Sequence, residues 1–410
     1  MDRIIFHIDV NSAYLSWSAI DLLQANPDSV DIRTIPAIIG GNRKTRHGIV
    51  LAKSLSAKNI YHIHTAEPVA NALKKCPTLT IIPPDHDSYS RHSKQFVGFL
   101  RSLTSEIEQV SVDECYLDYT TIASRFSSPE EGAAYIRNYI YSHFGFTVNV
   151  GISSNKVLAK MASDFEKPNK THTLFPDEIQ KKMWPLPISS LFMAGHASVA
   201  VLQKLDIHTI GDLARMDPAI LSLHLKSHGK MLWEYANGID KSEVNYLPEK
   251  PKSIGNTVTL PMDISNIEQL EEVIVAITEQ VTYRLRKENL LATVVNVQLR
   301  TKNFVDFSHQ SKLDSATSST KEILKNAKDL LKEMYKDGMF IRLVGVRVDG
   351  LVEKEELQLS LFGNTEENKK QQKLDSVLDG LNEKYGYNFV KRAGKMNVDK
   401  KIFDNFRKKF

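Results

Sequence analysis

The chain is poor in cysteine and has no long apolar run. Two cysteines in 410 residues, Cys76 and Cys115, are too few for a disulfide framework and suit a reducing cytosol. No apolar run approaches the roughly 18 residues of a membrane span. The N-terminus enters a predicted strand at once, without the pattern of a signal peptide. These absences predict a cytoplasmic protein that has no membrane partner.

Two common nucleotide-binding motifs are also missing from the sequence. No segment matches a Walker phosphate loop or the glycine fingerprint of a dinucleotide-binding fold. His62 and His64 form an isolated pair without further ligands nearby in the sequence, which favours ordinary hydrogen-bonded histidines over a metal site.

Strong basic charge is absent from the main body of the chain. The net charge is +4, but residues 391–410 hold eight Lys or Arg against two Asp. Residues 1–390 are therefore slightly acidic, with 45 basic and 47 acidic side chains. Any contact of the main body with nucleic acid must come from local patches of basic residues.

Three carboxylates in two separate segments are the strongest chemical signal that is present. Asp9 stands near the end of the apolar run 3–10, and Asp113 and Glu114 follow Ser111 and Val112. Such a set suits a pair of divalent metal ions in phosphoryl transfer. Successive strand residues point to opposite faces, so Asp113 and Glu114 serve one site only if they lie at a hairpin tip. An ordinary acidic turn is the alternative reading.

The hydrophobic pattern predicts two α+β parts joined by a helical segment. Strands are expected at 1–10, 107–112 and 147–153, with long helices at 88–104 and 130–144. This order favours a mixed sheet with helices on one face and an early inserted subdomain. Short helices follow from 188 to 237, and a proline-containing linker follows at 246–251. The remainder alternates as βαββαβ, from a strand at 253–260 to a strand at 340–349.

Five short motifs, taken in order, resemble the Y-family translesion DNA polymerases (UmuC- and DinB-like). The resemblance covers residues 1 to about 362. The motifs are Asp9-Val10-Asn11-Ser12-Ala13-Tyr14, Ser111-Val112-Asp113-Glu114, Gly151 to Lys160, Lys167-Pro168-Asn169, and Lys252-Ser253-Ile254-Gly255. Each motif is weak alone, but their order is specific.

The resemblance implies an α+β protein with the right-hand architecture of a polymerase. The expected parts are a palm (1–10 and 80–174), small fingers (11–79), a helical thumb (175–245), a linker (246–252), a separate βαββαβ little finger (253–350), and a tail (351–410). The thumb would carry helix-hairpin-helix turns at Gly195 and at Thr209 to Leu213.

The resemblance also implies the roles of individual residues. Asp9, Asp113 and Glu114 would be catalytic and would bind two Mg²⁺ together with the backbone carbonyl of Val10. Tyr14 would be the steric gate beneath the sugar of the incoming dNTP. The triphosphate would meet Lys167 and Lys58.

Some positions depart from the family pattern. Leu55 and Lys58 stand where many members carry a tyrosine and an arginine that touch the triphosphate. Leucine donates no hydrogen bond and lysine lacks the bidentate fork of arginine, so weaker nucleotide binding is expected. Lys160 is expected on a solvated face of its helix.

Two further surfaces are expected to meet partners. The strand at 294–301 alternates between apolar residues and a polar face that carries Arg300, and this face suits phosphate contacts with primer-template DNA. In the tail, Gln358-Leu359-Ser360-Leu361-Phe362 resembles the short peptide by which bacterial polymerases dock on the sliding clamp. Accessory subunits are further possible partners.

Together these features predict a template-directed DNA polymerase of the translesion class that acts in the response to DNA damage. One alternative is a non-catalytic scaffold of the same fold that recruits other polymerases to the clamp. Another is a different two-metal enzyme on a palm-like sheet, such as a cyclase or a nuclease. The three retained carboxylates argue against the first, and the thumb, linker and little finger argue against the second.

Overall fold

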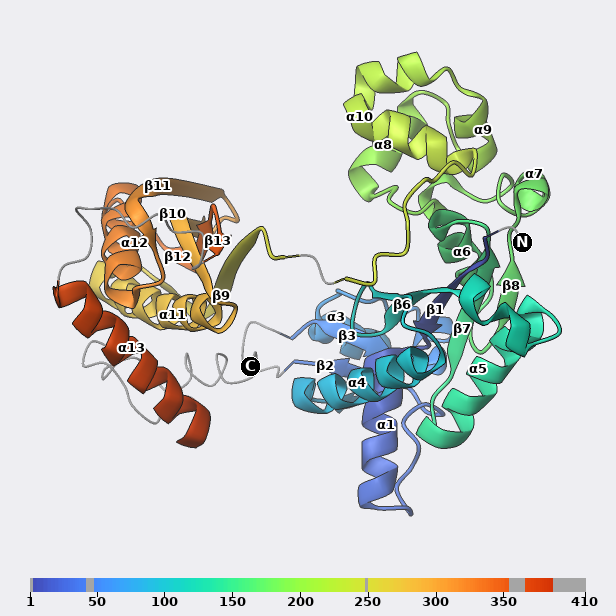
Figure 1. Ribbon diagram of the computed structural model, residues 1–410, viewed down its shortest axis with the longest axis horizontal. Coiled ribbons are helices and arrows are strands. Elements are labelled where there is room, and N and C mark those ends of the chain that lie inside the picture. Colours follow the sequence, from blue (N-terminus) through green and yellow to red (C-terminus); the bar gives the residue numbers. More distant parts are fainter. Residues whose placement is uncertain (1–2, 42–47, 248–249, 354–365, 386–410) are drawn as a thin grey trace. The chain divides into compact units, whose positions relative to one another are not determined.

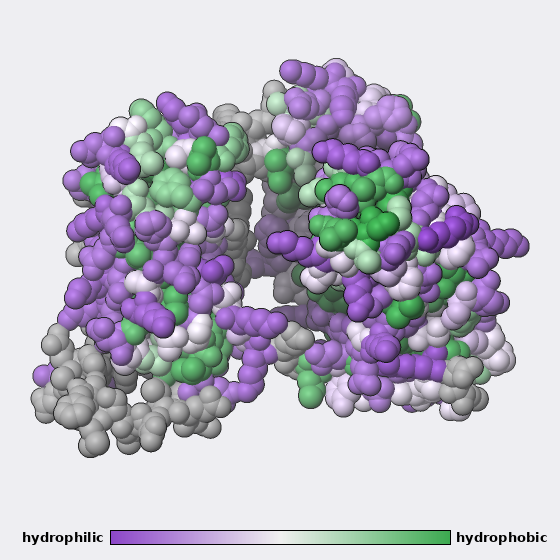
Figure 2. Space-filling model, turned by 90° about the horizontal axis from the view of Figure 1, so that it is seen from above, coloured by the Kyte–Doolittle hydropathy of each residue, from purple (hydrophilic) through white to green (hydrophobic). Residues whose placement is uncertain are grey.

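The computed structural model describes residues 3–41, 48–247, 250–353 and 366–385, which divide into two compact units (Figure 1). Of the described residues, the first unit contains 3–41 and 49–247, and the second contains residue 48 together with 250–353 and 366–385. Among these residues, no helix is long and apolar enough to cross a membrane. Hydrophilic side chains cover most of the visible face of each unit, with small apolar patches between them (Figure 2).

A five-stranded sheet lies at the centre of the first unit, in the order β5-β6-β1-β7-β8. Strand β1 is central and antiparallel to both neighbours, while β7 and β8 are parallel. The strands are β1 (Ile5–Val10), β5 (Ile107–Gln109), β6 (Glu114–Asp118), β7 (Val148–Ser153) and β8 (Thr171–Thr173).

Strand alternation gives β1 two different faces. Phe6, Ile8 and Val10 point into the main apolar core, which the helices α1 (Ala13–Ala25), α4 (His86–Leu103) and α5 (Pro129–Phe144) share. His7 and Asp9 point to the opposite face, where α6 (Lys156–Ser163) lies. A 3₁₀ helix at Tyr119–Arg125 follows β6.

Gly151 on β7 allows α6 to lie close to the sheet. A Cβ at this position would be 1.9 Å from the backbone oxygen of Ala159, which is an impossible distance. Glycine is therefore required here for the close packing, and this packing brings the side chains of α6 over β1.

The small inserted subdomain contains a three-stranded sheet of order β3-β2-β4. It is built from β2 (Ala37–Gly40), β3 (Val50–Lys53), α2 (Leu55–Asn59), α3 (Val69–Lys75) and β4 (Thr80–Ile82). Its own apolar core includes Ile38, Val50 and Val69. Ser54 caps α2 by accepting a hydrogen bond from the backbone N–H of Ala57, so the helix begins directly after β3.

Helices dominate the end of the first unit. They are α7 (Ile179–Lys182), α8 (His196–Lys204), α9 (Ile210–Arg215) and α10 (Pro218–Ala236), with short 3₁₀ turns at Pro176–Glu178 and Ile188–Ser190. Gly195 is the N-cap residue of α8. Thr209 and Asp212 form a reciprocal capping box at the start of α9.

The second unit is a four-stranded antiparallel sheet, β11-β10-β12-β9, with two helices against one face. Its elements are β9 (Ser253–Ile264), α11 (Ile267–Lys287), β10 (Leu290–Thr301), β11 (Asp306–Thr317), α12 (Thr320–Met334) and β12 (Ile341–Asp349), and the short β13 (Val352–Glu353) pairs with β10. The predicted βαββαβ order is confirmed. On the polar side, Arg300 forms a bidentate ion pair with Asp306 on the neighbouring strand.

A last helix, α13 (Glu366–Tyr385), packs on the helical side of the second unit. Asp379 forms a bidentate pair with Arg286 of α11, and buried Asp375 accepts a hydrogen bond from the backbone N–H of Thr320. The sequence pattern predicts only a charged tail at 351–410, and this helix was not predicted. The predicted clamp peptide, Gln358 to Phe362, lies outside the described residues.

Candidate active site

Asp9 and Glu114 face each other across two neighbouring strands. Asp9 of β1 is the direct register partner of Glu114, the first residue of β6. Opposed residues of an antiparallel pair share one face, and their Cβ atoms lie about 5 Å apart. The Asp9 side chain is almost fully buried, while that of Glu114 is one-quarter exposed. The sheet therefore brings two carboxylates from distant segments together.

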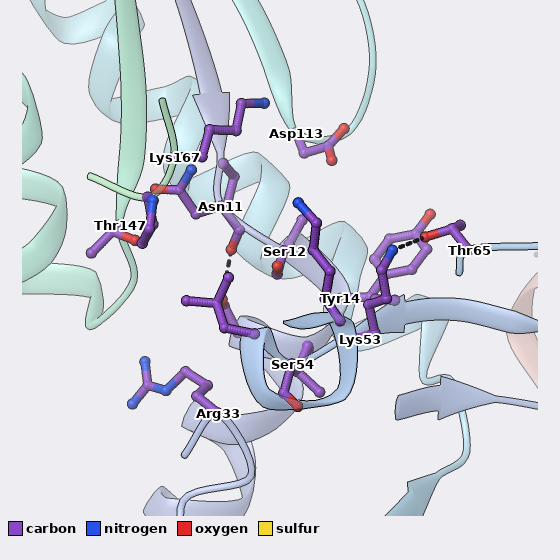
Figure 3. A pocket seen from close by; sticks show the side chains of 18 of the residues that line it. Asn11, Ser12, Tyr14, Arg33, Lys53, Ser54, Thr65, Asp113, Thr147 and Lys167 are labelled. Atoms are coloured by element: carbon purple, nitrogen blue, oxygen red, sulfur yellow. Dashed lines mark hydrogen bonds between the residues drawn. The ribbon is translucent and has the colours of Figure 1, made fainter. Parts of the chain in front are cut away.

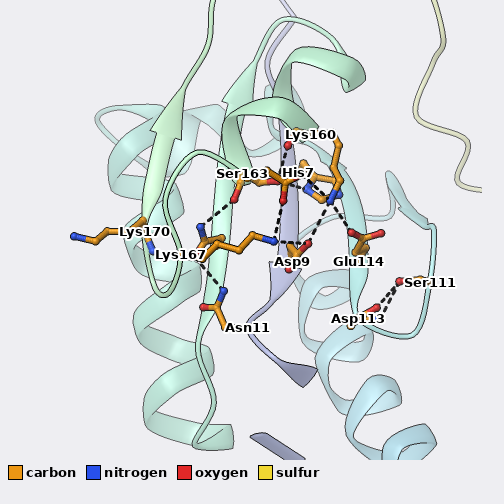
Figure 4. Close-up of polar contacts among 12 residues, drawn as sticks. His7, Asp9, Asn11, Ser111, Asp113, Glu114, Lys160, Ser163, Lys167 and Lys170 are labelled. Atoms are coloured by element: carbon orange, nitrogen blue, oxygen red, sulfur yellow. Dashed lines mark hydrogen bonds and ion pairs between the residues drawn. The ribbon is translucent and has the colours of Figure 1, made fainter. Parts of the chain in front are cut away.

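Two lysines neutralise these carboxylates (Figure 4). Lys160 Nζ lies 2.7 Å from Glu114 Oε1 and 3.3 Å from Asp9 Oδ2. Lys167 Nζ lies 3.1 Å from Asp9 Oδ2 and 2.9 Å from Asp164 Oδ1. The expectation that Lys160 lies on a solvated helical face is wrong. Its side chain is only 12% exposed, because α6 packs directly over β1.

The buried charges shift one another's pKa values. Burial raises the pKa of Asp9, but Lys167 and Lys160 outweigh that effect, and the net pKa is lowered. Burial raises the pKa of Glu114 and the adjacent Asp9 adds to the rise, although Lys160 opposes it. Burial lowers the pKa of Lys160, but the surrounding carboxylates raise it overall. The cluster thus holds its lysines charged and places its two carboxyl groups under mutual repulsion.

Asp113 lies in the loop before β6 rather than on the strand. Its carboxylate accepts a hydrogen bond of 2.6 Å from the Ser111 hydroxyl, and its backbone oxygen accepts one from the Val10 N–H. Asp113 thus precedes the strand, whereas Glu114 is its first residue and pairs with Lys160. Within the described residues, no three metal-ligating side chains converge on one point.

A pocket of about 560 Å³ opens beside these residues, between the five-stranded sheet and the inserted subdomain (Figure 3). Asp9, Val10 and Asp113 line one side of it. Tyr14 and Lys167 line it as well, and the inserted subdomain contributes Lys53, Leu55, Lys58 and Thr65. The structure therefore brings all of the predicted site residues of the first unit to this pocket, except Glu114, which faces the adjoining lysine cluster.

Burial raises the pKa of the Tyr14 hydroxyl, and the charge of Asp113 raises it further. The phenol of Tyr14 is therefore neutral at physiological pH, and its ring presents an uncharged wall to the pocket.

A buried amide network, which the sequence analysis missed, positions the segment that carries Lys167. Asn149 on β7 donates to the backbone oxygens of Ser163 and Glu166, at 3.0 and 2.6 Å. Its side-chain oxygen accepts from Asn11 Nδ2 and from the backbone N–H of Lys170, both at 3.1 Å. A polar residue within an apolar strand, as Asn149 is within 148–153, was the available signal.

Two other titratable groups beside the cluster are structural. Burial, with help from the charge of Lys160, lowers the pKa of His7 to about 3, so its imidazole is neutral. The Ser163 hydroxyl donates to the Lys160 carbonyl, so His7 Nδ1–H donates to that hydroxyl at 2.8 Å. Burial raises the pKa of Cys115 to about 12, which keeps it a thiol in the core.

The family is established by comparison with known proteins. Residues 8–164 match the impB/mucB/samB family model, and residues 251–361 match the model of that family's C-terminal domain. A relative from Clostridium acetobutylicum named DNA polymerase IV is 43% identical over 98% of this chain and 100% of its own. Another from Acetivibrio thermocellus, with the same name, is 34% identical over 96% of this chain and 97% of its own.

A solved structure agrees in fold. A Y-family DNA polymerase chimera superposes with a TM-score of 0.72, at 22% identity, over 85% of this chain and 99% of its own. The right-hand polymerase architecture and the little-finger fold predicted from the sequence are confirmed. The chain belongs to the impB/mucB/samB family, that is, to the Y-family DNA polymerases.

Proposed function

We propose that this protein is a template-directed DNA polymerase that transfers a nucleotide from a dNTP to a primer 3′-hydroxyl and bypasses damaged templates with low fidelity. The observation that carries the proposal is the pairing of Asp9 with Glu114 across β1 and β6, next to the pocket that holds Tyr14. The polymerase relatives, together with two adjacent carboxylates beside a pocket, support an active enzyme over a non-catalytic scaffold.

The donor set fits divalent metal ions. Asp9, Glu114, Asp113 and the Val10 carbonyl offer only oxygen ligands, which Mg²⁺ prefers. We propose that they hold two Mg²⁺, and that Lys160 balances the negative charge of Asp9 and Glu114. The metals would supply stabilisation of the charge that develops on the attacking and leaving oxygens.

The chain's own residues bind and orient the nucleotide. Lys167 and Lys58 line the pocket and give its anionic ligand two positive charges. Tyr14 forms the wall on which the sugar lies, and its ring leaves no room for a 2′-hydroxyl. Leu55 donates no hydrogen bond at the position where a tyrosine would, so nucleotide affinity depends on the lysines.

DNA and protein partners are assigned to other parts of the chain. We propose that the polar face of β10 and β12 contacts the primer-template backbone, and that Gln358, Leu359, Ser360, Leu361 and Phe362 dock on the sliding clamp in the cytoplasm. Arg300 already forms an ion pair with Asp306, and the Asp306 carboxylate partly offsets the attraction of Arg300 for a phosphate.

Primer extension with Mg²⁺ and dNTPs tests the proposal. The wild type is expected to extend a primer, and Asp113→Ala with Glu114→Ala is expected to abolish extension while DNA binding, which depends on phosphate contacts elsewhere, stays nearly intact. Glu130→Ala, which removes an exposed carboxylate from α5, is the matched control and should extend normally. Extension by the double variant at the wild-type rate would refute the assignment, and an inactive wild type that still binds the clamp would identify a scaffold.

A further inference from the structure

Lys53 is a cation in the pocket that the family pattern does not assign. It is the last residue of β3, and strand alternation places it on the same face as Leu51. Both residues line the pocket together with Tyr14. Lys53 Nζ donates a hydrogen bond of 2.8 Å to the Thr65 hydroxyl (Figure 3), so the ammonium is oriented by a neutral group.

The charge of Lys53 is not neutralised within the described part of the chain. No carboxylate forms an ion pair with it there, and none pairs with Lys58, which lines the same pocket. The nearby carboxylate of Glu67 is engaged by Lys75 at 2.7 Å and by the backbone N–H of His64 at 3.0 Å. Two lysines of the inserted subdomain thus line one pocket and have no counter-ion among the residues that the structure describes.

The electrostatic effect of this arrangement is visible on Lys53 itself. Burial lowers the pKa of the Lys53 ammonium, and the charge of Lys58 lowers it further, while Glu67 opposes the change. Placing like charges together in a half-buried pocket is unfavourable, and an anionic ligand between them relieves the repulsion.

The other cations that line the pocket have partners already. Lys167 pairs with Asp9 and Asp164, and Arg33 pairs with Asp31. Among the described residues that line the pocket, the positive charge without an ion-pair partner therefore lies at Lys53 and Lys58. It lies on the same short segment as Leu55, which lacks a hydrogen-bond donor.

We infer that Lys53 is a further nucleotide-binding residue, whose ammonium, oriented by Thr65, contacts the triphosphate of the incoming nucleotide beside Lys58. This inference rests on the proposed function and deepens it. The contact replaces the hydrogen bond that Leu55 cannot donate, because a charge-assisted bond from an ammonium to a phosphate oxygen is among the stronger polar contacts.

Binding of inorganic tripolyphosphate to the full-length protein, measured by calorimetry, tests the inference without requiring catalysis. Lys53→Met is expected to weaken binding about tenfold, the equivalent of about 1.4 kcal/mol. Lys53→Arg, which keeps the charge, should retain most of the affinity. Lys74→Met removes an exposed lysine of α3 outside the pocket and should bind like the wild type. Equal affinity of Lys53→Met and the wild type, or no binding by the wild type, would overturn the inference.

Single-nucleotide insertion provides a second readout. Lys53→Met should raise KM for all four dNTPs about tenfold and leave kcat within about twofold, since the contact serves binding rather than the reacting atoms. Thr65→Val, which removes only the orienting hydroxyl, should raise KM by a smaller factor. A KM change confined to particular bases, with unchanged tripolyphosphate binding, would assign Lys53 to the base and overturn the inference.

The two hypotheses fail in different ways. If the wild type does not extend primers but Lys53→Met still loses tripolyphosphate affinity, then the polymerase proposal fails and the polyphosphate site remains. If the wild type extends primers and Lys53→Met matches it in both assays, then only the role of Lys53 fails. Thermal unfolding of each variant verifies that the fold is intact.

Discussion

Tyr14 stacks on Tyr89, with ring centroids 4.4 Å apart and ring planes inclined by 10°. Tyr89 is buried, and its hydroxyl makes a hydrogen bond of 2.9 Å with the Ser18 hydroxyl of α1. The face of Tyr14 that contacts Tyr89 is therefore supported by a fixed ring. Because Tyr89 prevents the Tyr14 ring from shifting, this ring excludes an additional ligand atom more strictly than a loosely packed side chain would.

Replacing Tyr14 by Ala should relax the choice of sugar. Without the ring, a 2′-hydroxyl fits, and the ratio of rNTP to dNTP incorporation efficiency should rise by at least about tenfold. Tyr14→Phe keeps the wall and removes only the hydroxyl, so it should retain the wild-type ratio. An unchanged ratio in Tyr14→Ala, measured by single-nucleotide insertion, would mean that Tyr14 is not the gate.

Replacing Lys160 by Met should make stability depend on metal. The change leaves Asp9 and Glu114 with less compensating charge, so the metal-free protein should lose about 2–3 kcal/mol of stability. Mg²⁺ should then raise the Tm of the variant more than that of the wild type.

Lys156→Met on the same helix is the matched control for this experiment. Lys156 pairs with Glu108 at 2.7 Å, away from Asp9 and Glu114. This variant should also lose stability, but its response to Mg²⁺ should equal that of the wild type. Equal Mg²⁺ responses of all three proteins would show that the carboxylates do not bind the metal.

Replacing Leu361 and Phe362 by Ala should abolish stimulation by the sliding clamp. Few residues carry the binding energy of so small a contact, and tethering to the clamp raises the local concentration of enzyme at the primer end. Single-turnover insertion on a short primer should be unchanged. Asn364→Ala with Thr365→Ala is the control, and extension is compared with and without loaded clamp. Equal stimulation of both variants would remove the peptide from the proposal.

Replacing Glu271 by Gln should flatten part of the acid dependence of stability. Burial raises the pKa of Glu271, but Lys328 and Lys332 outweigh it, and the net pKa lies below the ordinary 4.5. The ion pairs of Glu271 therefore stabilise the folded state above about pH 4.5, and this stabilisation is lost as pH falls through the lowered pKa of Glu271.

The measurement for Glu271 is the free energy of unfolding of the second unit in the full chain, by hydrogen exchange between pH 3 and pH 7. At neutral pH, Glu271→Gln should lose about 0.5–1 kcal/mol, because the ion pairs are partly exposed. The difference from the wild type should shrink below pH 4.5. Glu268→Gln, an exposed change on the same helix, should show no such convergence.

The residue types that a metal site needs can be read from the sequence, whereas features that depend on packing cannot. The sequence predicts Asp9 and Glu114 as metal ligands because metal chemistry requires carboxylates, and the register of β1 with β6 places the two residues side by side. The environment of Lys160 was predicted wrongly because residue spacing shows which side chains share a face of a helix. It does not show whether that face meets solvent or another element of the fold. Gly151 lets α6 approach the sheet, and this role can be recognised only once the positions of both α6 and β7 are known.

The fold was predictable from the order of strands and helices, but α13 was not. Its residues are largely polar, and its attachment depends on Arg286, Asp375 and Asp379, whose partners lie about a hundred residues apart in the chain. Lys53 was missed for a similar reason, since only the fold of the inserted subdomain brings it to Thr65.

The attachment of α13 changes how the candidate clamp peptide is connected to the enzyme. Strand β13, which ends at Glu353, is paired with β10, and α13, which begins at Glu366, is held on α11 and α12. Strand β13 and helix α13, which stand before and after the candidate clamp peptide in the sequence, thus belong to the same unit. If the proposed peptide docks on a clamp, both flanking elements connect the clamp to this one unit, and Arg286→Met, which removes the ion pair with Asp379, is expected to loosen the connection on the α13 side.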